Sequence, residues 1–261
     1  MQREHSMTYY LWKLMRTVRN WPLYIFNRLG WIHRETLTYK LRSGMTLTSR
    51  NFSTDRCGIN EVWFDHIYEP PGFDWAACRV IIDVGANIGS FTIRAATLAP
   101  EAKIFAYEAE PETAKILSRN VEENRLSPRV CAFSAAVGGK DGTAELYVTK
   151  RCSWFNSLYK PQNHEGIAVS VPVISLATIF AQNAIQECDC LKLDCEGAEY
   201  DILYTLSAED LGKIRMIVME YHDLPQGGRF THVHLRSYLE ERGLDVVERV
   251  NCILYAQRKN R

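Results

Sequence analysis

The chain has 261 residues, of which 46% are hydrophobic and 24% charged, with 31 basic and 31 acidic side chains. These proportions are typical of globular proteins and exclude a disordered or fibrous chain. The length suits one large α/β domain with an appendage, or two small domains.

The net charge of zero conceals an asymmetry between the two parts of the chain. Residues 1–56 carry ten Lys or Arg against three Asp or Glu, a net charge of +7, so the remainder carries −7. An acidic body disfavours binding to phosphate backbones. We therefore expect no nucleic-acid partner.

The eight cysteines are sparse for a disulfide scaffold, and several stand in apolar runs, where Cys acts as a small hydrophobe. They predict free thiols in a reduced, cytoplasmic protein. The cluster Cys188-x-Cys190-x4-Cys195 lacks the paired spacing of a zinc site. The sequence therefore predicts no zinc there.

The N-terminal segment is basic and aromatic. Residues 5–34 contain five Lys or Arg and no acid, interleaved with Tyr and Trp, and Pro22 divides them into two short helical pieces. The charges leave no apolar run long enough to span a bilayer and no signal peptide. Residues 1–50 are therefore interpreted as an arm that packs on the domain with a solvated basic face. The alternatives are peripheral membrane contact through residues 1–35, which would make the protein membrane-associated, and a protein partner.

From residue 79 onward, strand-like and helix-like segments alternate, which predicts an α/β domain over residues 51–261. Parallel strands are expected at residues 79–83, 103–107, 129–135, 189–194 and 214–221. Helices are expected at residues 90–99, 112–124, 175–183, 197–206 and 232–242. Residues 245–250 and 252–257 predict a closing hairpin. The expected fold is a Rossmann-like, seven-stranded, mostly parallel sheet with an antiparallel C-terminal hairpin strand.

An insertion is expected at about residues 143–173, as two antiparallel strands joined by a polar loop. Loops of this kind carry function and close over ligands in many enzymes. Residues 150–166 are therefore predicted to contain a substrate lid.

Ligands of such sheets bind at the carboxyl ends of the strands. Gly85 and Gly89 follow the first strand and allow a tight turn with a close backbone approach to a ligand. Glu108 ends the second strand, where a carboxylate can accept both hydroxyls of an adenosine ribose. The order of these features predicts a nucleoside cofactor.

The residues of this turn distinguish between cofactors. Asn87 stands where the dinucleotide fingerprint G-x-G-x-x-G needs its second glycine, and Asp83 precedes the turn. A carboxylate repels pyrophosphate, whereas it attracts the sulfonium and ammonium groups of S-adenosylmethionine. S-adenosyl-L-methionine is therefore the predicted cofactor.

Four motifs together resemble the FkbM family of class I methyltransferases over about residues 55–257. They are Ile82-Asp-Val-Gly-Ala-Asn-Ile-Gly-Ser-Phe91, Tyr107-Glu-Ala-Glu-Pro111, Ala135-Ala-Val-Gly138 and Leu191-Lys-Leu-Asp-Cys-Glu-Gly-Ala-Glu199. The resemblance implies O-methylation of a hydroxyl on a sugar, a glycolipid or a polyketide-type small molecule. The predicted cofactor contacts are Asp83, Gly85, Ala86, Asn87, Gly89, Glu108 and Ala136.

Methyl transfer to an alcohol requires that the acceptor oxygen be positioned and its proton removed. Asp194 and Glu196 follow the fourth strand and His222 follows the fifth, so these three residues are the predicted catalytic groups. Each has a structural alternative, namely binding the cofactor ammonium, capping a helix or packing. A divalent cation at Asp194, Glu220 and His222 is a minor alternative, and the prediction is that no metal is bound.

Three other functions stay open at this point. One is a nucleotide-dependent oxidoreductase, a second is a non-catalytic module that binds S-adenosylmethionine, and the third is a methyltransferase for protein or nucleic acid. The acidic body and the absence of an Asn-Pro-Pro-Tyr-type tetrapeptide after the fourth strand argue against the third. The identity of the acceptor and the oligomeric state do not follow from the sequence.

Overall fold

A computed structural model describes residues 7–51, 53–148 and 167–259. Its main feature is a seven-stranded sheet in the order β11-β12-β10-β9-β3-β4-β5. In chain order the strands are β3 (Val80–Val84), β4 (Lys103–Glu108), β5 (Val130–Ser134), β9 (Cys190–Leu193), β10 (Met216–Glu220), β11 (Leu244–Glu248) and β12 (Ile253–Arg258). The pairs β3–β4, β4–β5, β3–β9 and β9–β10 are parallel, while β12 is antiparallel to β10 and β11. This arrangement confirms the predicted fold class.

The strands alternate their side chains between two cores, as period-two geometry requires. Ile81 and Ile104 belong to the core on one face of the sheet, and Ile82 and Phe105 belong to the core on the other. All four are fully or almost fully buried. Central strands covered on both faces read as nearly continuous apolar runs, which is why the sequence revealed them.

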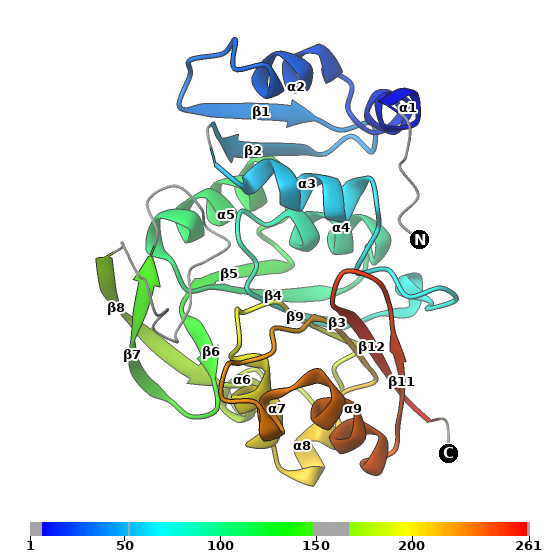
Figure 1. Ribbon diagram of the computed structural model, residues 1–261, viewed down its shortest axis with the longest axis vertical. Helices are drawn as coiled ribbons and strands as arrows, with labels where there is room; N and C mark the ends of the chain where they lie inside the picture. The colour runs from blue at the N-terminus through cyan, green and yellow to red at the C-terminus, as the bar shows by residue number, and fades with distance from the viewer. Residues whose placement is uncertain (1–6, 52, 149–166, 260–261) are drawn as a thin grey trace.

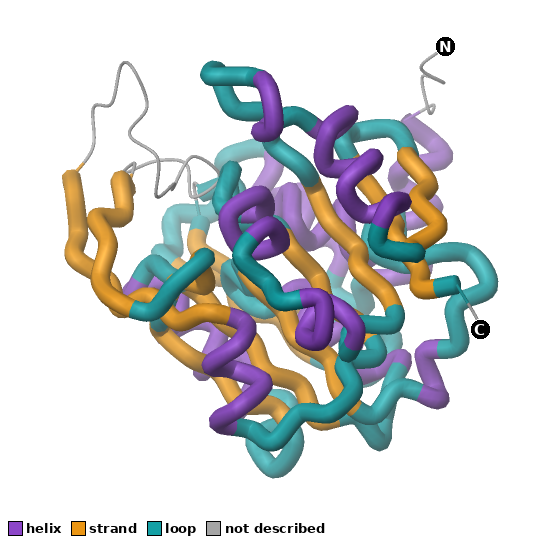
Figure 2. Tube along the Cα trace, turned by 90° about the horizontal axis from the view of Figure 1, so that it is seen from below, coloured by secondary structure: helices purple, strands orange, loops and turns teal. Residues whose placement is uncertain are grey.

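Helices cover both faces of the sheet (Figures 1 and 2). One face of the sheet, the face toward the N-terminal elements, carries α3 (Asp55–Trp63), α4 (Ser90–Leu98) and α5 (Pro111–Glu123). The opposite side carries α6 (Leu176–Gln182), α7 (Glu199–Tyr204), α8 (Ala208–Gly212) and α9 (His232–Glu241). Short 3-10 turns occur at η1 (Trp75–Ala77) and η3 (Gly228–Phe230).

Helix α5 shows how local sequence sets an element. The side chain of Glu110 accepts hydrogen bonds from the backbone N–H groups of Glu112 and Thr113, and Pro111 occupies the first turn. Leu117 and Val121 are buried one turn apart on the face toward the sheet. The helix therefore begins directly after the tip of β4.

The first 50 residues contain more than the two predicted helices. α1 (Met7–Thr17) and α2 (Trp21–Arg28) are followed by an antiparallel hairpin of β1 (Thr36–Lys40) and β2 (Thr46–Arg50). This hairpin was not predicted from the sequence. The buried side chain of Asn120 in α5 accepts from the Thr48 N–H at 2.7 Å and donates to the Thr48 carbonyl at 2.9 Å. The hairpin is thereby bonded directly to α5.

The insertion forms a separate three-stranded sheet in the order β6-β8-β7, made of β6 (Ala136–Gly138), β7 (Gly142–Val148) and β8 (Ile167–Ser175). β7 pairs antiparallel with β8, and β6 pairs parallel with it. The predicted lid at residues 150–166 lies outside the described residues.

No helix in the described ranges combines the length and the hydropathy needed to cross a membrane. The seven cysteines within these ranges are free thiols. Cys188 and Cys190 are buried against the sheet.

Candidate functional site

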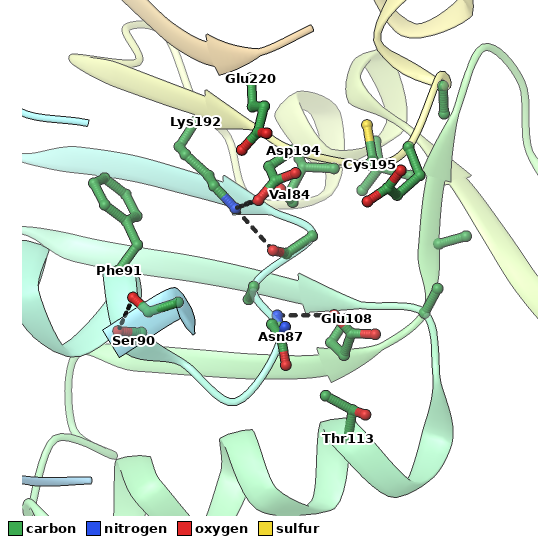
Figure 3. A pocket seen from close by; sticks show the side chains of 18 of the residues that line it. Val84, Asn87, Ser90, Phe91, Glu108, Thr113, Lys192, Asp194, Cys195 and Glu220 are labelled. Atoms are coloured by element: carbon green, nitrogen blue, oxygen red, sulfur yellow. Dashed lines mark hydrogen bonds and ion pairs between the residues drawn. The ribbon is translucent and has the colours of Figure 1, made fainter. Parts of the chain in front are cut away.

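A cleft opens at the carboxyl ends of β3, β4, β9 and β10, with α3 as an additional wall. The residues that line it come from these strand tips and the loops after them, from α3 and the loop after it, from the first turns of α4 and α5, and from β6 and β7: Gly58, Glu61, Val62, Tyr68, Val84, Gly85, Ala86, Asn87, Ser90, Phe91, Glu108, Ala109, Thr113, Ala136, Val137, Leu146, Lys192, Asp194, Cys195, Glu196, Ala198 and Glu220. Figure 3 shows Lys192, Asp194 and Glu220 on one side of the cleft and Asn87, Glu108 and Thr113 on the other. This is the edge at which α/β sheets bind ligands.

The turn between β3 and α4 requires glycine at position 85. Gly85 has a φ of +70°, and a Cβ built there would lie 1.7 Å from the backbone oxygen of Asp194. The N–H groups of Gly85 and Ala86 both donate to the carbonyl of Tyr107 in β4. The loops after β3 and β9 therefore meet backbone to backbone, with Ala86 and Asn87 facing the cleft.

Glu108 is fixed at the tip of β4. Its carboxylate accepts from the N–H of Asn87 at 2.8 Å and from the N–H of Glu110 at 2.9 Å. Burial raises the pKa of Glu108 to about 7, although these two hydrogen bonds act to lower it. Glu108 and Ala136 both line the cleft, as their predicted cofactor role requires.

Asp83 and Gly89 lie outside the cleft wall. Asp83 is fully buried, accepts from the Thr92 hydroxyl at 2.5 Å and lies 3.4 Å from the Lys192 ammonium. Lys192 also donates to the Gly85 carbonyl at 2.8 Å. Asp83 therefore balances a buried cation that holds the β3–α4 turn, and Gly89, with a φ of +88°, starts α4. Their predicted direct contact with a cofactor stays a prediction, and their positions favour an indirect role.

Carboxylates crowd the side of the cleft formed by β9, β10 and α3. The Tyr68 hydroxyl donates to Asp194 at 2.9 Å and to Glu220 at 3.4 Å. Burial, with the charges of Glu220 and Asp194, raises the pKa of Glu61 to about 8, and burial with Asp194 raises that of Glu220 to about 7. A cationic ligand is favoured here because it would relieve the repulsion between these carboxylates and stabilise their ionised forms.

His222 lies beside this cluster, bridging two carboxylates. Its Nδ1 is 3.0 Å from a carboxylate oxygen of Glu199, and its Nε2 is 3.6 Å from Glu196. Burial acts to lower the pKa of His222, but the hydrogen bond and charge of Glu199, with the charges of Glu196 and Asp194, raise it to about 10. His222 is therefore an imidazolium at neutral pH, with both ring N–H groups facing acids.

Glu199 is an organising residue that the prediction did not include among the site residues. It is fully buried and accepts from the N–H groups of Cys195 at 2.9 Å and Gly197 at 2.8 Å. It thus fixes the turn after β9 and, through His222, the position of Glu196. Burial and nearby Asp194, opposed by His222, raise the pKa of Glu196 to about 8.

Tyr68 and Glu61 were also missed by sequence reasoning. They come from the stretch between β2 and β3, which precedes every recognised motif, and only tertiary packing brings them to the strand tips. By contrast, the structure does bring together the three predicted catalytic residues. One ligand-type atom each from Asp194, Glu196 and His222 lie within 4.8 Å of one another.

That triad has the donor types of a divalent-cation site. The protonated His222 provides an alternative charge balance because it lies between Glu199 and Glu196. Together, the cleft combines a glycine turn, a ribose-type carboxylate and an acidic cluster. Such a site can bind a cationic nucleoside and remove a proton from a neighbouring group.

Comparison with known proteins identifies the family. Residues 83–246 match the family model of the methyltransferase FkbM domain. The chain is 26% identical over 213 residues to the 31-O-demethyl-FK506 methyltransferase FkbM of Streptomyces tacrolimicus, covering 72% of this chain and 82% of that protein. It is 23% identical over 259 residues to the AMB antimetabolite synthetase AmbE of Pseudomonas aeruginosa, covering 84% of this chain but only 12% of that much longer protein.

Among solved structures, an O-methyltransferase family protein from Burkholderia thailandensis is 12% identical, with a TM-score of 0.46, covering 79% of this chain and 59% of that one. The family match includes the turn after β3, the tip of β4 and the loop after β9, which together form most of the cleft. This chain is a member of the FkbM methyltransferase family.

Proposed function

We propose that the protein is an S-adenosyl-L-methionine-dependent O-methyltransferase that acts on a hydroxyl of a small molecule, such as a sugar, a glycolipid or a polyketide-type compound. The observation that carries this proposal is the placement of the acidic cluster beside the β3–α4 turn and Glu108. A sulfonium cofactor and a weakly acidic acceptor both need carboxylates at this position.

The cofactor would be held by the chain's own groups at the tips of β3 and β4. Glu108 has its carboxylate ready to accept the ribose hydroxyls, and the backbone of Ala86 and Asn87 lines the same wall. The acidic cluster would face the sulfonium and ammonium charges. The bound cofactor supplies the activated methyl group, and the protein supplies orientation and a base.

We infer a more specific division of roles among the three predicted catalytic residues. His222 is already protonated at neutral pH, so it is poorly suited to accept a proton. Glu196, with a pKa raised to about 8, lines the cleft and is held by His222. We assign proton removal to Glu196, orientation of the acceptor to Asp194, and positioning of Glu196 to His222 and Glu199.

The acceptor class rests on similarity and on charge. The relative from Streptomyces tacrolimicus is named for O-methylation of 31-O-demethyl-FK506, a small molecule. The acidic body again disfavours a nucleic-acid acceptor. The family match also weighs against the oxidoreductase alternative, because the matched family consists of methyltransferases.

Cofactor binding is tested by calorimetry with S-adenosylhomocysteine on the wild type, Glu108→Gln and Glu108→Ala. We expect about tenfold or greater loss of affinity in both variants, because one carboxylate would bind two ribose hydroxyls. Glu112→Ala, an exposed acid on α5, is the matched control and should bind normally. Unchanged affinity in a folded Glu108→Ala variant would contradict the cofactor site.

Catalysis is tested by following a labelled methyl group from S-adenosylmethionine into a panel of hydroxylated sugars, glycolipids and polyketide-type acceptors. A product carrying a new methyl ether, identified by mass spectrometry and NMR, is the expected result. Transfer to nitrogen or carbon alone would contradict O-methylation, and binding of cofactor with no transfer to any acceptor would favour a non-catalytic module.

A further inference from the structure

The exposed hydrophobic side chains of the protein are unevenly distributed. Of the twelve large hydrophobic residues that are exposed within the described ranges, seven belong to residues 7–31: Met7, Tyr9, Trp12, Met15, Phe26, Leu29 and Trp31. Trp12 is 51% exposed and Trp31 is 67% exposed. Indole rings that do not enter a core usually mark an interaction site.

Both N-terminal helices turn an apolar stripe outward. In α1, Leu14 is buried toward the protein, whereas Trp12 and Met15 lie on the opposite side, next to Arg16. In α2, Tyr24 and Asn27 are buried, whereas Phe26 is exposed, as is Leu29 directly after the helix. Figure 1 shows α2 above β1 and α1 to the right of the hairpin, both at the N-terminal end of the molecule and away from α7 to α9. We call the seven exposed hydrophobic residues Met7, Tyr9, Trp12, Met15, Phe26, Leu29 and Trp31 the outer patch.

Positive charge surrounds the outer patch. Arg16 and Arg42 line one shallow hollow together with Trp12 and Met15, and the Arg16 guanidinium lies 4.8 Å from the Trp12 ring centre. Six exposed cations of this region form no ion pair within the described part of the chain: Arg16, Arg19, Arg28, Arg34, Lys40 and Arg42. Glu35 is the only Asp or Glu in residues 7–51.

We propose that the outer patch docks the protein on an anionic lipid surface. Trp and Tyr rings are favoured at the headgroup level of a bilayer, apolar Met and Leu enter the acyl boundary, and Arg side chains contact lipid phosphates. A second copy of the chain is disfavoured as the occupant, because a two-fold contact would place these unbalanced cations against one another. The two helices would lie on the membrane surface, and the cleft would lie on the part of the domain that does not contact the membrane.

This inference stands independently of the proposed function, because none of the patch residues lines the cleft. The test needs the full chain, because the N-terminal elements share their hydrophobic core with the domain. Leu14, Tyr24 and Ile81 belong to one hydrophobic cluster. Deleting the N-terminal residues would therefore expose that core and is unsuitable as a test.

The test is sedimentation of the full chain with vesicles of phosphatidylcholine alone or with about 30% phosphatidylserine. We expect binding to the anionic vesicles only, and about tenfold weaker binding when NaCl is raised from about 0.1 M to about 0.5 M. Trp12→Ser/Met15→Ser and Arg16→Gln/Arg19→Gln should each weaken partitioning by about tenfold. The proposal would be overturned if the wild type sedimented equally with and without anionic vesicles.

Two control variants separate the patch from general surface properties. Val233→Ser/Val250→Ser removes hydrophobic side chains elsewhere that are even more exposed than Trp12 and Met15, and Lys115→Gln/Lys259→Gln removes exposed cations elsewhere. Both should bind vesicles as the wild type does, and an equal loss in either would contradict the assignment. Light scattering without lipid should show a monomer; a dimer that Trp12→Ser/Met15→Ser dissolves would replace the membrane by a second copy. Normal affinity for S-adenosylhomocysteine in every variant would keep this result separate from the cofactor site.

Discussion

Three charged side chains beside the cleft contact one another in series, from the fully buried Glu199 through His222 to the half-buried Glu196. Glu199 is fixed by two backbone N–H groups, His222 lies on Glu199, and Glu196 lies on His222. Each link holds the next, so a proton on His222 determines both the position and the acidity of Glu196. A histidine in this setting organises a base rather than acting as one.

The pH dependence of methyl transfer tests these roles. With Glu196 as the base, turnover of the wild type should rise through a pKa near 8, because the carboxylate must be ionised. Glu196→Gln should lose at least about a hundredfold in turnover and keep its affinity for S-adenosylhomocysteine. In His222→Gln the rise should move to higher pH, because the cation that lowers the pKa of Glu196 is removed.

The contrary outcome is equally definite. Were His222 itself the base, His222→Gln would be inactive at every pH, with no shifted profile to measure. Lys213→Gln removes a cation directly after α8 that does not line the cleft, so it serves as the charge control and should leave the profile unchanged.

Hydrogen bonds join the N-terminal hairpin β1–β2 to α5, the helix that follows the tip of β4. Asn120 bonds to both backbone groups of Thr48, and its amide also donates to the Ile88 carbonyl in the turn before α4 at 2.7 Å. One buried amide thus joins β2, α5 and the β3–α4 turn. The hairpin therefore contributes to the frame of the cofactor wall.

Asn120→Ala should accordingly destabilise the protein by about 3 kcal/mol, because it removes three buried hydrogen bonds and leaves the Thr48 and Ile88 groups without partners. Urea unfolding monitored by circular dichroism measures the change. Asn183→Ala is the matched control, since that amide makes one hydrogen bond to the Ile179 carbonyl and is half-buried, so it should cost about 1 kcal/mol. Equal costs for the two variants would contradict the bridging role.

The elements also show what the sequence could and could not reveal. The strands β3, β4, β9 and β10 were predictable because burial on both faces makes them short apolar runs. The hairpin β1–β2 was missed because its strands, Thr-Leu-Thr-Tyr-Lys and Thr-Leu-Thr-Ser-Arg, are mostly polar and contain no apolar run. The site residues at strand ends could be predicted, because they stand at or directly after an apolar run: the glycine turn, Glu108, Asp194, Glu196 and His222. Tyr68 and Glu61 reach the cleft only through tertiary packing, which no local sequence pattern encodes.

Several carboxylates of the acidic part of the chain are buried close to one another, and this raises their pKa values. Glu61, Glu196 and Glu220 have pKa values raised to about 8, 8 and 7, and His222 has one raised to about 10. In each case the folded state binds the proton more tightly than the unfolded state. The stability that these groups contribute is complete when the pH is below their pKa values in the unfolded state. It is lost as the pH rises through their pKa values in the folded state.

The free energy of unfolding should therefore fall steadily from about pH 5 to about pH 10. Carboxylates with lowered pKa values, such as Glu69, Asp210 and Asp223, act in the opposite direction but only as pH falls through their folded values, below the usual range of acids. Glu61→Gln/Glu220→Gln stays neutral at every pH, so it should match the wild type near pH 5 and exceed its stability near pH 9. Glu241→Gln, an exposed acid on α9, should follow the wild type throughout. Urea unfolding at the two pH values measures both differences, and a wild type that gains stability toward pH 9 would mean that the clustered acids ionise without penalty in the fold.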